Sequence, residues 1–164
     1  MIILRPISDE DIVEIQAWPS YGEGFEQMDY ALREQGWLDK FRDRPDTWIY
    51  IAEADKRVIG FSLLSRTAVK NAEFRIALHP HRTGKRFGRK MTIQTLETGF
   101  RQLGMEQIHL IVRKNNPRAL KLYRSIGFVV TGESSHAIQG RKIDFIDMNM
   151  TGERFNNLRI EETK

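Results

Sequence analysis

Residues 73–90 read Glu-Phe-Arg-Ile-Ala-Leu-His-Pro-His-Arg-Thr-Gly-Lys-Arg-Phe-Gly-Arg-Lys, and the rest of the chain is organised around them. Residues 74–78 are apolar except for Arg75 and are compatible with a β-strand, which Pro80 would end. Gly84 and Gly88 then loosen the backbone where a long helical pattern begins. The stretch therefore predicts a strand, a glycine-bearing turn and the start of a helix.

Such a junction favours the binding of an anion. The first N–H groups of a helix have no partner inside the helix, and the helix dipole makes that end positive. A solvated basic turn would have the same composition, so this stretch alone leaves both interpretations open. The glycine spacings of dinucleotide-binding folds and of nucleoside-triphosphate loops are absent. The basic residues around the turn are Arg82, Lys85, Arg86, Arg89 and Lys90.

The composition is that of a soluble globular protein. The chain has 164 residues, of which 40% are hydrophobic and 29% charged, enough for one domain with its own core. We expect that domain to cover residues 1–150, followed by a loose polar tail at 151–164. The first apolar run ends at Arg5 and no other run could cross a bilayer, so we expect a cytoplasmic protein without a membrane partner.

The cysteine content and the net charge limit which kinds of site and ligand are possible. The chain has no cysteine, which excludes disulfides, thiolate metal sites and a cysteine nucleophile. The net charge of +4 suits a small anionic ligand as well as nucleic acid. His79 and His81 are two residues apart, but no further ligand cluster accompanies them, so no metal is expected.

Periodicity and turn signals predict alternating strands and helices. The expected strands are 2–4, 47–53, 57–64, 73–78, 107–112, 128–131 and 142–150. The expected helices are 9–18, one or two within 27–41, 84–103 and 117–126.

A second pattern lies at residues 116–128, Asn-Pro-Arg-Ala-Leu-Lys-Leu-Tyr-Arg-Ser-Ile-Gly-Phe. Asn116 can cap a helix, Pro117 suits its first position and Gly127 suits its end. Taken alone, Tyr123 is a core tyrosine on the apolar face and Ala119 is a close-packing residue.

Together the two stretches resemble the GNAT superfamily of N-acetyltransferases. Residues 76–88 follow its acyl-CoA-binding strand and loop, I-A-V-x-P-x-x-R-G-K-G-I-G, except that Thr83 replaces Arg or Gln and Arg86 replaces the inner glycine. Residues 116–128 follow its N-x-x-A-x-x-L-Y-x-x-x-G-F motif. The resemblance covers about residues 2–150. It implies an α/β (α+β) fold with a mixed, mostly antiparallel sheet of six to seven strands, about four flanking helices and a splayed strand pair that holds the cofactor.

The resemblance also implies a reaction, the direct transfer of an acetyl group from acetyl-CoA to a primary amine in a ternary complex. Tyr123 matches the family's general acid. Glu73 matches the base of one branch, although a water chain is an open alternative and a solvated surface role explains Glu73 equally well. The residues matching the cofactor site are Ile76, Ala77, Leu78, Thr83, Gly84, Lys85, Arg86, Phe87, Gly88, Arg89, Asn116 and Ala119.

The acceptor is expected to be a small-molecule amine or a protein N-terminal amine, bound near residues 18–48 and 134–140. The acidic residues Glu23, Glu26 and Asp29 would attract a cation, and a homodimer is an expected assembly. Two other functions stay open. One is an acyl-CoA binder without catalysis, and the other is an RNA-binding module that uses the basic turn, although the stacking aromatics of single-strand readers are absent.

Overall fold

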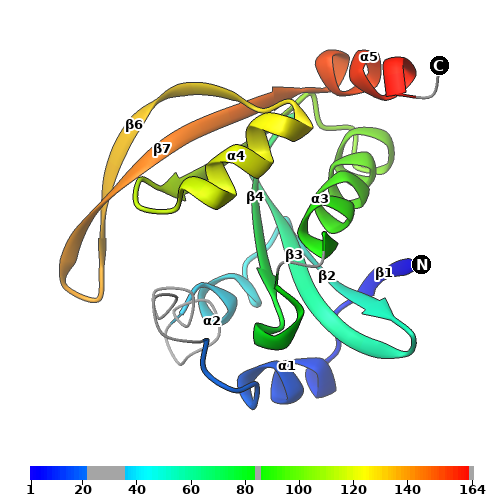
Figure 1. Ribbon diagram of the computed structural model, residues 1–164, viewed down its shortest axis with the longest axis vertical. Coiled ribbons are helices and arrows are strands. Elements are labelled where there is room, and N and C mark those ends of the chain that lie inside the picture. Colours follow the sequence, from blue (N-terminus) through cyan, green and yellow to red (C-terminus); the bar gives the residue numbers. More distant parts are fainter. Residues whose placement is uncertain (22–35, 84–85, 163–164) are drawn as a thin grey trace. The chain divides into compact units, whose positions relative to one another are not determined.

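The computed structural model describes residues 1–21, 36–83 and 86–162 (Figure 1). Contacts divide the chain into two compact units, residues 1–66 with 74–96 and residues 67–73 with 97–164. Some predictions fall outside the described residues. These are the helix expected at 27–35, the acidic residues Glu23, Glu26 and Asp29, and the loop residues Gly84 and Lys85.

Seven strands are found over the described residues, in the order β1-β2-β3-β4-β5-β7-β6. β4 and β5 are parallel, whereas the pairs β1–β2, β2–β3, β5–β7 and β6–β7 are antiparallel. This arrangement confirms the predicted mixed, mostly antiparallel sheet. The strands are β1 Ile2–Pro6, β2 Thr47–Ala54, β3 Arg57–Ala68, β4 Asn71–Leu78, β5 Gln107–Arg113, β6 Val129–Ile138 and β7 Arg141–Thr151.

The described residues also form five α-helices, one more than expected. A 3₁₀ turn, η2, covers Pro80–Arg82, and a π turn, η3, continues α3 over Thr98–Gln102. The helices are α1 Asp9–Gln16, α2 Trp37–Phe41, α3 Phe87–Glu97, α4 Pro117–Ile126 and α5 Gly152–Glu162.

In the N-terminal unit, helices cover both faces of the strands. Ile51 and Phe61 are paired across β2 and β3, and both lie in the core cluster that includes residues of α1 and α2. The next pair, Ala52 and Gly60, faces the other way, toward Met91 of α3. A Cβ on Gly60 would lie 2.9 Å from the Met91 Cε and 2.7 Å from the Ala77 carbonyl oxygen, so only glycine lets α3 approach this closely.

A buried ion pair ties β1 to α1. Asp11 is 5% exposed and accepts hydrogen bonds from Arg5 Nη1 and Nη2 at 2.7 and 2.8 Å. It also closes a capping box by accepting from the backbone N–H of Ser8 at 2.8 Å, while the Arg5 Nε donates to Glu53 at 2.7 Å. The hydrogen bonds from Arg5 are the main reason that the pKa of Asp11 falls from 3.8 to about 2.

In the C-terminal unit, β6 and β7 form one long hairpin (Figure 1). We expected β6 to end at residue 131, and this is wrong, because the strand continues to Ile138. Its polar residues make cross-strand hydrogen bonds that could not be predicted from the local sequence. The Ser134 hydroxyl donates to Asp147 at 2.6 Å and the Ser135 hydroxyl donates to Asp144 at 2.7 Å.

The loose tail expected after residue 150 is also wrong over the described residues, since α5 occupies them. Phe155 is fully buried and its ring lies 5.4 Å from that of Phe100. The Arg154 Nε donates to the Gly127 carbonyl at 2.6 Å, and Arg159 donates to the Ile126 carbonyl at 3.2 Å. These tertiary contacts stabilise a helix whose own sequence is polar.

Five described non-glycine residues adopt the left-handed backbone conformation that glycine prefers, and three of them lie in the turn between β2 and β3 and just before α3. Asp55 and Lys56, with φ of 51° and 63°, form the two-residue turn between β2 and β3. Arg86 has φ of 63°, and its carbonyl oxygen accepts a hydrogen bond from the backbone N–H of Lys90 at the start of α3. Arg86 is the position at which the GNAT motif has its inner glycine, and its conformation gives a physical reason for that glycine.

We predict that Asp11→Asn lowers the free energy of unfolding by roughly 2 kcal/mol at pH 7, because each unit of pKa shift is worth about 1.4 kcal/mol. The folded-state pKa is lowered, so this stabilisation is present above the ordinary pKa of 3.8 and is lost as the pH falls through about 2. Urea unfolding at pH 7, 4 and 3 measures it. Asp43→Asn, at an exposed carboxylate, is the control. A difference from wild type that does not shrink below pH 4 contradicts the prediction.

We predict that Arg86→Gly raises the free energy of unfolding by about 1 kcal/mol, because it relieves a left-handed residue that bears a Cβ. The same substitution at Arg124, inside α4, should lower it by about 1 kcal/mol. Thermal unfolding of both variants without ligand compares them. The prediction fails if the two substitutions change stability in the same direction.

Candidate functional site

The site begins where β4 loses its partner strand. The ladder between β4 and β5 consists of the pairs Asn71–Gln107, Ala72–Ile108 and Glu73–His109. β4 continues to Leu78, and no further β5 pair is found among the described residues. Ile76, Ala77 and Leu78 lie on this continuation, as the sequence predicted. The β4–β5 ladder therefore ends before residues 76–78.

The end of β4 is held by contacts that the sequence did not predict. The hydroxyl of Tyr21, a residue only 5% exposed, donates to the Leu78 carbonyl oxygen. On the other side, the backbone N–H of His79 donates to the Ile59 carbonyl of β3 at 2.8 Å. Tyr21 falls within residues 18–48, where we expected the acceptor. Its hydroxyl instead fixes the strand on which the cofactor is expected.

The turn after β4 is closed by its own hydrogen bonds. The His79 Nδ1 accepts the backbone N–H of His81 at 3.0 Å, and the His79 carbonyl accepts that of Arg82 at 2.8 Å. The Thr83 hydroxyl donates weakly to the Pro80 carbonyl at 3.4 Å. Thr83 therefore helps to complete the 3₁₀ turn at the position where the motif has Arg or Gln.

The start of α3 packs onto β4. Phe87 is half-buried and lies in one apolar cluster with Ile76 and Leu78. Gly88 is buried, and its carbonyl accepts the Thr92 hydroxyl at 2.7 Å. The structure thus brings together the predicted strand residues and the first residues of the helix, whose initial N–H groups, Arg89 included, can bind an anion.

The second motif forms α4 as predicted at both ends. The Asn116 side chain accepts the backbone N–H of Ala119 at 3.1 Å, and Pro117 is the first helical residue. Gly127 follows with φ of 123°, and a Cβ there would collide with Leu158 of α5. The helix is therefore fixed by local caps and by its contact with α5.

Tyr123 is fixed by packing. It is 8% exposed, and its ring meets that of Phe128 edge-on, with 5.8 Å between centroids. Burial raises the pKa of the Tyr123 hydroxyl well above its ordinary value of 10.0. The hydroxyl is protonated at neutral pH, as a tyrosine of ordinary pKa also is.

Glu73 lies at the last β4–β5 pair, beside His109 of β5. His109 is in turn opposite Asn149 of β7, and two residues farther along β5 Ile111 is opposite Asp147. Alternation along a strand and registry across strands place these side chains on one face of the C-terminal unit. Sequence reasoning missed His109. The signal that could have placed it on the open face was the alternation within residues 107–113, where every second side chain is buried.

The described part of the chain lacks two kinds of feature. No three His, Asp or Glu side chains there come together as metal ligands. Among the helices in those same residues, none is both long and apolar enough to span a membrane.

Comparisons with known proteins agree with these features. The family model of the acetyltransferase (GNAT) domain matches residues 1–129. Spermidine N(1)-acetyltransferase of Vibrio cholerae is 28% identical over 141 residues, which is 84% of this chain and 80% of the relative. The SPbeta prophage-derived N-acetyltransferase YokL of Bacillus subtilis is 26% identical over 94% of this chain and 92% of its own.

A solved structure shows the same fold. A chimera of the Vibrio cholerae spermidine N-acetyltransferase SpeG with hSSAT superposes with a TM-score of 0.78, at 26% identity over 95% of this chain and 98% of the other. The family model covers most of the chain, and both sequence motifs occupy the elements that the family implies. The chain therefore belongs to the GNAT family of acetyltransferases, enzymes that transfer an acetyl group from acetyl-CoA to an amine.

Proposed function

We propose that this enzyme acetylates a primary amine of a polyamine such as spermidine, by direct attack on acetyl-CoA in a ternary complex, with Tyr123 as the proton donor. The observation that carries the mechanism is the buried, protonated Tyr123 on a helix held at both ends. The polyamine acceptor is supported by the spermidine N(1)-acetyltransferase relative, which shares most of its length with this chain.

The reaction sets three requirements. The attacking nitrogen must be neutral, although an alkylammonium has a pKa of about 10.4. The thioester oxygen gains negative charge as the N–C bond forms, and the C–S bond then breaks to release a thiolate. The proton that the nitrogen loses balances the proton that the sulfur gains, so an acid and a base are both needed.

Tyr123 supplies the proton for the sulfur. Because its burial disfavours the tyrosinate, the hydroxyl remains a donor across the physiological pH range. Its edge-on contact with Phe128 and the caps of α4 restrict the ring to one orientation. Asn116 and Ala119 contribute through that cap, which holds the first turn of the helix.

The cofactor would be held by backbone groups. Ile76, Ala77 and Leu78 offer the open strand edge to the amides of the pantetheine arm. A backbone N–H there would also stabilise the thioester oxyanion, a contribution worth about 3 to 4 kcal/mol in other enzymes. The turn at residues 83–89 and the start of α3 would bind the pyrophosphate, and Arg86 would add a charge-assisted contact.

The face bearing Glu73 suits a cationic acceptor. Glu73 and Asp147 are carboxylates on that face, and Asp147 is oriented by the Ser134 hydroxyl at 2.6 Å. Polyamines carry several ammonium groups, and carboxylates are the side chains that bind such groups most strongly. Glu73, directly or through water, would take the proton from the amine that reacts.

An amine panel tests the acceptor. With acetyl-CoA and the purified enzyme, kcat/KM for spermidine should exceed that for glucosamine, an aminoglycoside and a peptide with a free N-terminus by roughly tenfold or more, since about 1.4 kcal/mol of added ammonium binding gives that factor. Mass spectrometry identifies the acetylated nitrogen. A peptide as the best substrate would overturn the polyamine assignment. Binding of acetyl-CoA without turnover of any amine would favour a non-catalytic protein.

We predict that Tyr123→Phe lowers kcat by roughly ten- to ten-thousand-fold while KM for acetyl-CoA stays within about twofold, because only the proton donor is removed. Phe keeps the ring that packs on Phe128, so thermal stability should barely change. Phe128→Leu is the matched control, since it removes the packing partner and keeps the hydroxyl. A folded Tyr123→Phe enzyme with unchanged kcat would identify Tyr123 as a core residue only.

A further inference from the structure

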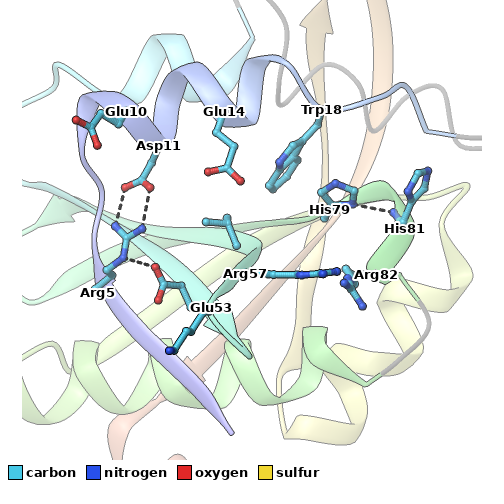
Figure 2. Close-up of a pocket in the computed structure, with 12 residues that line it drawn as sticks. Arg5, Glu10, Asp11, Glu14, Trp18, Glu53, Arg57, His79, His81 and Arg82 are labelled. Atoms are coloured by element: carbon cyan, nitrogen blue, oxygen red, sulfur yellow. Dashed lines mark hydrogen bonds and ion pairs between the residues drawn. The ribbon is translucent and has the colours of Figure 1, made fainter.

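The N-terminal unit contains a cavity of about 790 Å³ that the proposed reaction does not use (Figure 2). Its volume lies within the range of small-molecule sites, roughly 300 to 1,000 Å³. It is lined by α1, by Arg5 of β1, by the ends of β2 and β3 with the turn between them, and by η2 with the preceding His79. Charged side chains dominate the lining, with two glutamates on α1 and arginines at the start of β3 and on η2.

The α1 wall is acidic. Glu10 and Glu14 both line the cavity, and Glu14 points into it (Figure 2). Asp11, which lies between them in the sequence, is neutralised by Arg5, which also binds Glu53. The surplus charge of this wall is therefore negative and comes from the two glutamates.

The opposite wall is basic. Arg57 is the first residue of β3, and its guanidinium points toward that of Arg82 on η2 (Figure 2). Neither guanidinium has an ion-pair partner among the described residues. His79 lies beside them, and burial lowers its pKa, with further lowering by the charges of His81 and Arg82. These observations all indicate a positive potential at this end of the cavity.

Two guanidinium groups that converge without a carboxylate repel each other, and an anion between them removes the repulsion. A single arginine can donate hydrogen bonds to both oxygens of a carboxylate. A phosphate monoester is a dianion with three terminal oxygens, so it can accept hydrogen bonds from both arginines at once. The geometry of the basic wall therefore favours phosphate, while the acidic wall disfavours a second anionic group at the far end.

We propose that Arg57 and Arg82 bind a phosphate monoester in this cavity. Two sources share this chemistry. One is the 3′-phosphate of CoA, in which case the site rests on the proposed function. The other is a separate phosphorylated small molecule that binds beside the cofactor.

Calorimetric titration distinguishes the two sources. Wild type, Arg57→Gln and Arg82→Gln are titrated with CoA and with 3′-dephospho-CoA, and then with O-phosphoethanolamine after saturation with CoA. Lys142→Gln, which removes a charge from the exposed end of the β6–β7 hairpin, is the control. Thermal unfolding of each variant confirms that it is folded.

If the cofactor supplies the phosphate, each arginine variant binds CoA about tenfold or more weakly than wild type and binds 3′-dephospho-CoA unchanged. If a separate molecule supplies it, O-phosphoethanolamine binds the CoA-saturated wild type and loses about tenfold in affinity in both arginine variants. The proposal is overturned if neither arginine variant loses more affinity for CoA or for O-phosphoethanolamine than the Lys142→Gln variant does. A failure of the acetyltransferase assignment is distinguished from a failure of this proposal, because it would appear as an absence of amine acetylation by the wild-type enzyme.

Discussion

Every backbone N–H and C=O of a buried strand needs a hydrogen-bond partner, and among the described residues β5 pairs with only the first three residues of β4. Its ladder with β5 ends at Glu73, yet the strand runs five residues farther. The Leu78 carbonyl is satisfied by Tyr21, a side chain distant in sequence. The remaining open edge is the feature on which the proposed binding of acetyl-CoA depends, because a ligand with amide groups can complete the hydrogen bonding that β5 does not provide.

The charged residues of the N-terminal unit fall into two groups with different physical roles. Arg5, Asp11 and Glu53 form a closed network in which one guanidinium binds two carboxylates and the carboxylate of Asp11 is nearly buried. This network joins β1 to α1 and to β2. Arg57 and Arg82 are open charges that converge on a cavity, and an open charge of this kind is stabilised when an ion of opposite sign binds.

Burial has a different effect at Tyr123. Tyr123 is removed from water by the packing of α4, so its hydroxyl holds its proton more tightly than a solvated phenol. Glu73 is only half-buried and lies on a sheet face that also carries His109 and Asp147. The proposed proton donor thus lies in an apolar setting, and the proposed base lies on a polar sheet face.

The local sequence determined the features that depend on neighbouring residues. The caps of α4 at Asn116 and Gly127, the strand before Pro80 and the family motifs could all be predicted from it, because each is set within a few residues. The departure at Arg86 was also visible, although the reason for the usual glycine required the backbone angle.

Only the tertiary structure decided the rest. Helix α5 exists because Phe155 meets Phe100, and β6 is long because Ser134 meets Asp147; in both cases the partners lie 13 or more residues apart in a polar stretch. The neighbour of Glu73, His109, follows from strand register, and the cavity follows from the meeting of α1 with the β2–β3 turn. Register and burial depend on which distant residues come together, and no local pattern in this chain encodes that choice.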